Sequence, residues 1–263
     1  MIRFSPFAPV HRLRTLSFCS ALLVGACVSL PGWAQQTTPA GSTANASGLA
    51  ATENINSITR GAMAFAYDDR YEGVRGTPYV MRMWLPADIT LNSNVRIPSV
   101  RLKYDALRNH ILARPDNTRP DSVLLNPASV KSFAFQDALV PNQRRLFRRF
   151  DEAQSPSEKQ AFVEVLYEGQ YSLLKHYRKE YRKANFKGAY SDNRTYDEVI
   201  DRTVYYLRRP NGTIAEVKLN EKSFAAAAPE LAGRMKTVSE RAQRNLKTES
   251  DLTALLAAAD KQP

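Results

Sequence analysis

Apolar and polar residues alternate with a period of two through the middle of the chain. Residues 162–167 (FVEVLY) place two valines and a tyrosine on one face. Branched and aromatic residues in alternation predict a strand. A turn at Glu168-Gly169-Gln170 follows, because Gly169 can take a positive φ. We therefore expect a hairpin whose return strand is residues 171–179, although residues 172–184 (SLLKHYRKEYRKA) also fit an amphipathic helix.

A second hairpin has the stronger signal. Residues 202–208 and 213–219 both alternate, and Pro210-Asn211-Gly212 lies between them. Proline presets φ for a turn, and Asn-Gly tolerates the left-handed conformations of hairpin loops. The sequence therefore predicts two antiparallel strands here.

The preceding part of the chain predicts short strands separated by turn residues. We expect strands at residues 79–85, 99–104, 110–113, 122–125 and 130–135. Their spacing of about ten residues, with no long helix between them, indicates an antiparallel meander. The next segment, RRLFRRF, fits an edge strand or one turn of helix, and a surface loop follows it.

After residue 220 the period changes to that of a helix. Asn220 is a suitable N-cap for residues 221–228, and Pro229 ends or restarts that helix. An apolar stripe at helical spacing follows, and Thr248 to Asp251 resembles a capping box that opens a last helix. The predicted fold class is α+β: mainly an antiparallel β meander, open or barrel-like, with C-terminal helices. Residues 60–220 are the expected β domain and residues 221–263 the helical segment.

The first 34 residues predict a secretory signal peptide. They start with arginines and continue with an apolar run, and Gly32 and Ala34 supply the small residues of a cleavage site after Ala34. The alternative is a lipid anchor on Cys27, because Val24 to Cys27 resembles a lipobox. Residues 35–59 are rich in Thr, Ala, Ser and Asn, which predicts a flexible tether. The expected location is periplasmic or secreted.

Charge and cysteine content narrow the chemistry of the exported chain. Both cysteines, Cys19 and Cys27, lie in the leader, so the rest has no disulfide and no thiolate nucleophile. The whole chain has a net charge of +11, and loss of the three leader arginines leaves +8. Most of that excess lies after residue 140. No second segment is apolar over about 20 residues, so we expect no transmembrane span in the mature chain.

Two runs of basic residues interleaved with aromatic residues are the candidate binding site. Such a surface suits lipid phosphates, anionic phospholipid, acidic polysaccharide or nucleic acid, although export makes nucleic acid an improbable partner. The alternative is that these side chains line the solvent face of strands. The candidate anionic-ligand residues are Arg144, Arg145, Arg148, Arg149, Lys175, Arg178, Lys179, Arg182, Lys183 and Lys187.

Catalytic and metal-binding patterns are weak. His110 and His176, the two histidines after the leader, are expected to be surface or sheet-packing residues. Asp192, Asn193, Asp197 and Glu198 lack the spacing of a calcium loop, so we predict no metal and no cofactor. The enzyme alternative is a hydrolase that uses carboxylates brought together only by the fold. Its candidates are Asp68, Glu72 and Asp197.

Five segments carry a family resemblance: YEGVRGTPYV, VRLKYDALRNHILARP, VKSFAF, FVEVLYEGQYSLLKHYRKEYRKANFKGAY, and VYYL followed by GTIAEVKLN. Together they resemble an uncharacterised family of small exported bacterial proteins with a signal peptide, a β-rich fold and no assigned activity. The resemblance implies an envelope or secreted location and assigns no site residues. The sequence thus predicts a non-catalytic binding or structural protein whose partner is unknown, with an anionic envelope component or another envelope protein as the candidates.

Overall fold

The computed structural model describes six ranges of the chain: residues 64–65, 71–114, 122–136, 144–185, 194–242 and 248–261. The expected signal peptide (residues 1–34) and tether (residues 35–59) lie outside them. The described residues belong to one compact unit. Within them, no helix combines the length and apolar character needed to cross a membrane.

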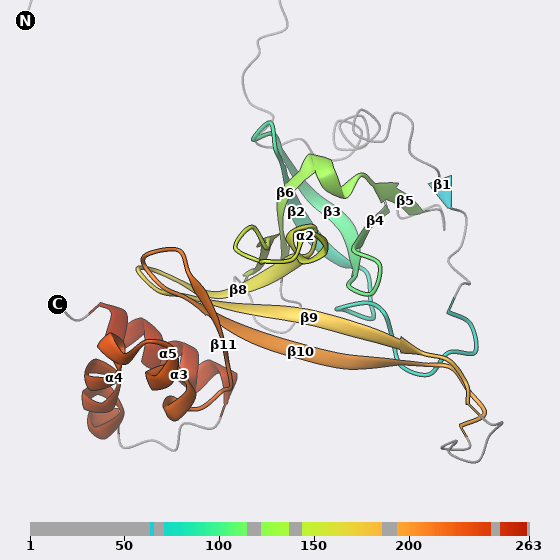
Figure 1. Cartoon of the computed structure of the whole chain (residues 1–263). Helices are drawn as coiled ribbons and strands as arrows, with labels where there is room; N and C mark the ends of the chain where they lie inside the picture. Colours follow the sequence, from blue (N-terminus) through green and yellow to red (C-terminus); the bar gives the residue numbers. More distant parts are fainter. Residues whose placement is uncertain are drawn as a thin grey trace, which may run out of the picture. The chain divides into compact units, whose positions relative to one another are not determined.

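The described strands form one antiparallel sheet (Figure 1). The strands are β1 (Ala64–Phe65), β2 (Leu85–Leu91), β3 (Arg96–Asp105), β4 (His110–Arg114), β5 (Ser122–Leu125), β6 (Val130–Gln136), β7 (Arg144–Arg149), β8 (Phe162–Glu168), β9 (Ser172–Arg182), β10 (Glu198–Arg208) and β11 (Ile214–Val217). Their order is β1-β5-β4-β3-β2-β6-β7-β8-β9-β10-β11. Because β1 and β11 do not pair in the described part of the chain, the sheet is open. The α+β meander is confirmed.

The two predicted hairpins are present as β8–β9 and β10–β11, and residues 172–182 are strand rather than helix. Gly212 has the expected positive φ of 83° in the β10–β11 turn. The prediction that Gly169 takes a positive φ was wrong, because its φ is not in the left-handed region. Glycine fits there because a Cβ atom would lie 2.3 Å from Asp260 Oδ2 and 2.5 Å from the Tyr167 hydroxyl.

The predicted strand at residues 79–85 was also wrong. Only Leu85 belongs to a strand, β2, while residues 80–83 form bends. Val80 and Met81 are consecutive, yet both pack against the same core. In a strand, the side chains of Val80 and Met81 would point to opposite faces. The apolar residues of this segment therefore lack the alternation that a strand requires. The segment at residues 144–149 is a strand, but β7 lies inside the sheet between β6 and β8 and is not an edge.

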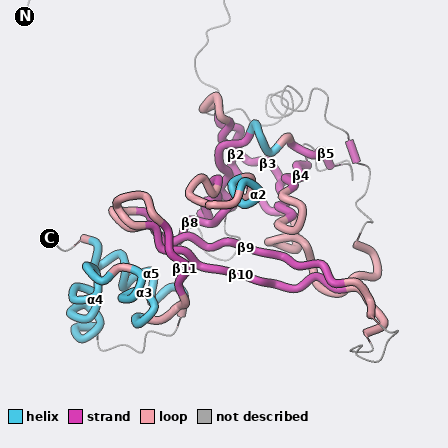
Figure 2. The backbone as a smooth tube through the Cα atoms, in the orientation of Figure 1, coloured by secondary structure: helices cyan, strands magenta, loops and turns pink. Residues whose placement is uncertain are grey.

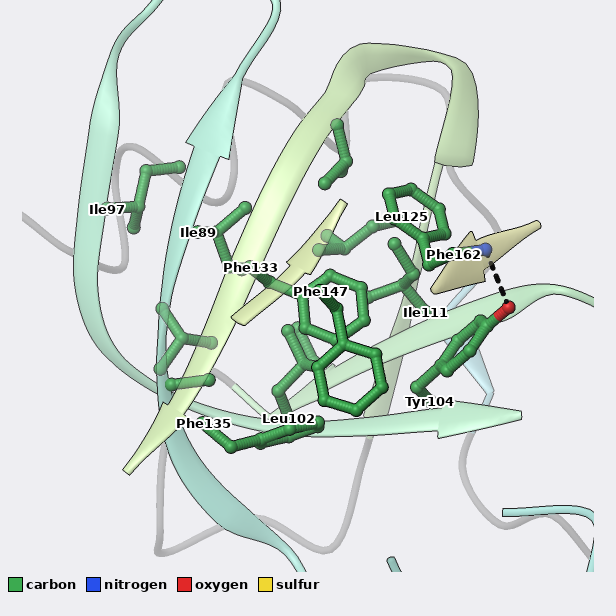
Figure 3. Close-up of a cluster of buried hydrophobic side chains, with 14 of the residues drawn as sticks. Ile89, Ile97, Leu102, Tyr104, Ile111, Leu125, Phe133, Phe135, Phe147 and Phe162 are labelled. Carbon is green, nitrogen blue, oxygen red and sulfur yellow. Dashed lines mark hydrogen bonds between the residues drawn. The ribbon is translucent and has the colours of Figure 1, made fainter. Parts of the chain in front are cut away.

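Strands β2 to β8 enclose the first hydrophobic core (Figure 3). Phe133 and Phe147 stack with ring centroids 5.1 Å apart and an interplanar angle of 8°. Tyr104 is buried against them; its hydroxyl accepts a hydrogen bond from the Phe162 amide at 3.1 Å and donates to Asn109 Oδ1 at 2.9 Å. Buried hydroxyls need such partners, and this pair ties the core to the β3–β4 turn.

Short helical turns η2 (Pro127–Ser129) and α2 (Pro156–Lys159) lie in loops between strands, and three helices end the chain: α3 (Glu221–Ala227), α4 (Pro229–Ala242) and α5 (Glu249–Asp260) (Figure 2). The predicted caps are confirmed, because Asn220 accepts from the Ser223 amide and Thr248 forms a capping box with Asp251. These helices cover the ends of β9, β10 and β11 in a second hydrophobic core.

Candidate functional site: a pocket on strands β9 and β10

Strands β9 and β10 are the longest in the sheet, and their side chains divide between two faces. The register is unbroken along both strands, so successive residues point to opposite sides. We define the core face as the side that continues both hydrophobic cores; in β9 it carries Leu173, Lys175, Tyr177 and Lys179. We define the pocket face as the opposite side; in β9 it carries Leu174, His176, Arg178, Glu180 and Arg182.

A pocket of about 510 Å³ opens on the pocket face, and we call it the His176 pocket. Three segments far apart in sequence form it: the β9–β10 pair, the β3–β4 turn and the loop that contains α2. The turn contributes Ala106 and Asn109, the loop contributes Ser157, Glu158 and Ala161, and the strands contribute His176, Arg178, Lys179, Glu180, Arg202 and Val204.

Two arginines stand directly opposite each other in this pocket. The register pairs Arg178 of β9 with Arg202 of β10. Like charges in such a position repel each other. Glu158 forms an ion pair with Arg178, and Glu180 bonds Arg202 Nε at 3.0 Å. The guanidinium groups of Arg182 and Arg202 hold the pKa of Glu180 below its usual value.

His176 lies beside the two arginines on the same face. The residue is 6% exposed, and its Nδ1 atom is buried with no hydrogen-bond partner among the described residues. The ring meets Phe150 edge-on, with centroids 5.5 Å apart. This burial lowers the pKa of His176 to about 4, so the imidazole is neutral at pH 7. His176 packs in the sheet as the sequence predicts, but it also lines a pocket, which the sequence did not predict.

The basic residues on the core face are engaged with acidic partners. Arg145 donates to both oxygens of the buried Glu164 carboxylate, at 2.6 and 2.8 Å, and to the Tyr177 hydroxyl at 2.6 Å. Lys175 Nζ bonds Glu249 Oε2 at 2.6 Å. These groups link strands β7, β8 and β9 to each other and to helix α5.

Tyrosines complete this polar cluster. The Tyr205 hydroxyl donates to Glu249 Oε2 at 2.6 Å. Burial, then the contact with Glu249, raises the pKa of Tyr205. Burial also raises the pKa of Tyr177, and the adjacent Glu164 carboxylate adds to it. Both phenols are therefore held neutral as hydrogen-bond donors.

Most of the other predicted patch residues that the structure describes bond elsewhere and do not line the pocket. Arg144 bonds Asp88 at 2.9 Å, Arg148 bonds Glu152 at 2.7 Å, and Arg149 donates to backbone carbonyls of Val130 and Pro127. Lys179 pairs with Asp201, and Arg182 bonds Glu180 at 2.9 Å. Lys183 follows β9, and Lys187 lies outside the described residues. Of the predicted residues that the structure describes, Arg178 and Lys179 line the pocket, and Lys179 does so although alternation places its side chain on the core face.

The two hydrolase candidates that the structure describes are not brought to the pocket either. Glu72 and Asp197 are absent from its described lining, and Asp68 lies outside the described residues. Asp197 instead accepts hydrogen bonds from the Tyr181 hydroxyl and the Ala184 amide. Of the calcium-loop residues, Asp192 and Asn193 lie outside the described ranges. In the described part of the chain, no group of three or more His, Cys, Asp or Glu side chains is placed to hold a metal ion.

Sequence analysis missed Arg202, Glu158 and Asn109. Arg202 lies in a strand that the alternation predicted. Its position opposite Arg178 can be inferred only once the β9–β10 register is known. No local signal identifies Glu158 or Asn109, because they reach the pocket from loops elsewhere in the chain.

Comparisons of this chain with known protein families, with curated protein sequences and with solved structures find no match.

Proposed function

We propose that this chain is an exported, non-catalytic binding protein of the bacterial cell envelope, and that it holds an anionic envelope component in the His176 pocket. One observation carries the proposal: two opposed arginines line a pocket beside a buried, neutral histidine. Guanidinium groups bind phosphate and carboxylate groups through paired hydrogen bonds. An anionic ligand would also relieve the repulsion between the two arginines.

The export half of the proposal rests on the leader sequence. Cell fractionation should recover the protein outside the cytoplasm, and sequencing of its N-terminus should begin at Gln35. If Cys27 carries a lipid instead, the protein should be recovered as a membrane-anchored form that begins at Cys27. Intact leader on cytosolic protein would contradict the proposed location.

The binding half can be tested by sedimentation with lipopolysaccharide or with vesicles of anionic phospholipid. We expect the protein to pellet with them at low salt and to be released as salt rises, because screening weakens attraction between exposed charges. The double variant Arg178→Gln/Arg202→Gln should pellet less than the wild type. Failure to pellet at any salt concentration would count against an anionic surface as the partner and would leave another envelope protein as the candidate.

The carboxylate-dependent hydrolase stays a prediction. No observation on Glu72 or Asp197 favours it, since Asp197 is engaged by a backbone amide and a tyrosine. We therefore do not develop a reaction for this chain.

A further inference from the structure

We propose that the ligand group of the His176 pocket is a phosphomonoester, whose oxygens accept hydrogen bonds from Arg178, Arg202 and His176. This inference rests on the proposed function and narrows it to one chemical class. The structure supports it through the number and position of the hydrogen-bond donors in the pocket.

Both arginines have donors to spare. In Arg178, Nη2 makes the hydrogen bonds to Glu158 and to the Tyr206 hydroxyl, while Nε and Nη1 have no partner among the described residues. In Arg202, Nε binds Glu180, and neither Nη atom has a hydrogen-bond partner among the residues that the structure describes. Their side chains are 42% and 53% exposed. One anion in the pocket can therefore receive donors from both strands.

His176 supplies a third donor from a different position. Among the described residues its Nδ1 atom has no acceptor within reach, so we place the ring hydrogen of the neutral imidazole on Nε2. His176 and Arg178 are two residues apart on β9 and therefore share a face, and the pocket is lined by both.

Three separate donor groups fit a phosphomonoester better than a carboxylate. A carboxylate has two coplanar oxygens, and one guanidinium fork can satisfy both. A phosphomonoester has three terminal oxygens, and their number matches the three donor groups, two arginines and a neutral imidazole. The pocket volume of about 510 Å³ lies within the usual range for small-molecule sites, so it can also hold part of the esterified group.

Glu158 competes for the same arginine. It lies on α2, pairs with Arg178, and lines the pocket. A bound dianion would place a second negative group beside this carboxylate. Removing the Glu158 charge should therefore strengthen phosphomonoester binding, whereas a purely structural ion pair would show no such effect.

Calorimetric titration of the full exported chain tests the inference. The soluble probes are glycerol 3-phosphate, inorganic phosphate and succinate, a dicarboxylate of the same charge. We expect glycerol 3-phosphate to bind about tenfold more tightly than succinate, which corresponds to one charge-assisted hydrogen bond. Arg202→Gln should weaken that binding about tenfold, and Glu158→Gln should strengthen it. Arg101→Gln is the matched control, since Arg101 is exposed on β3 and outside the pocket.

Vesicles distinguish the source of the phosphomonoester. Binding to phosphatidic acid but not to phosphatidylglycerol, a phosphodiester, would indicate a lipid headgroup, and tight binding of glycerol 3-phosphate alone would indicate a soluble ligand. Both results support the inference. Equal affinity for succinate and glycerol 3-phosphate would overturn the phosphomonoester while leaving an anion pocket intact. If no anionic probe binds, both the inference and the proposed function fail.

Discussion

The two faces of the β9–β10 pair differ in how they use basic residues. On the core face, the Lys175 side chain is 16% exposed and bonds Glu249, which also accepts a hydrogen bond from the Tyr205 hydroxyl. On the pocket face, Arg178 and Arg202 are much more exposed and keep unused donors. Neighbouring basic residues of one strand therefore have different roles, set by which side of the sheet each occupies. The basic residues of the core face are committed to the fold, whereas Arg178 and Arg202 on the pocket face are available to a ligand, next to a third buried cluster that includes Leu174 and Tyr206.

The largest expected effect is on the core face. Glu164→Leu leaves the Arg145 guanidinium without its carboxylate partner, and we expect a loss of about 3 to 5 kcal/mol in the free energy of unfolding. The same change on the pocket face, Glu180→Leu, should cost much less, because its ion pairs with Arg182 and Arg202 are exposed to solvent. Urea unfolding of both variants measures the contrast. Equal losses would remove the distinction between the faces.

The next largest effect is acid destabilisation through His176. Its folded pKa of about 4 lies below the unfolded value of 6.5, so the folded state disfavours the proton. The corresponding stability is fully present above pH 6.5 and is lost as pH falls through 4, by about 3 kcal/mol. Urea unfolding across this pH range should show the loss in the wild type. The variant His176→Gln should lack this component, and an unchanged pH profile in the variant would contradict the assignment.

A smaller effect is expected where the core face meets the helices. Glu249→Gln keeps the shape of the side chain but removes the charge that Lys175 and Tyr205 contact. We expect a loss of about 1 to 2 kcal/mol and faster amide hydrogen exchange in α5. Lys236→Gln on α4 is the control, because its nearest carboxylate is 3.9 Å away and both side chains are largely exposed. Unchanged exchange in α5 would show that the second core alone holds the helix.

The smallest effect on stability is expected for the arginines of the pocket. Arg178→Gln and Arg202→Gln each remove one exposed ion pair and also relieve the repulsion between opposed charges. The change in unfolding free energy should stay below about 1 kcal/mol, while anion binding falls. Loss of several kcal/mol in either variant would mean that these arginines hold the fold.

Local patterns predicted most of the sheet and helices. Alternation and the Asn211-Gly212 turn identified β10 and β11, and the capping box at Thr248 identified the start of α5. These signals depend on residues a few positions apart. Prediction failed at residues 79–85 and at Gly169, where contacts with distant parts of the chain decide the conformation.

The pocket could be predicted only in part, for a related reason. The basic run that contains Arg178 was visible in the sequence, but alternation sends Lys175 to the other face. Arg202 becomes a partner only through the pairing of β10 with β9. Asn109 and Glu158 reach the site because two loops pack over these strands, and a single sequence contains no signal for that packing.

The central claim is that the pocket face binds an anion and the core face does not. Nuclear magnetic resonance of the arginine, lysine and histidine side chains during titration with glycerol 3-phosphate tests it directly. We predict saturable shifts at His176, Arg178 and Arg202, with none at Arg145 or Lys175. Shifts centred on Arg145 and Lys175, or no saturable shift at any of the five residues, would contradict it.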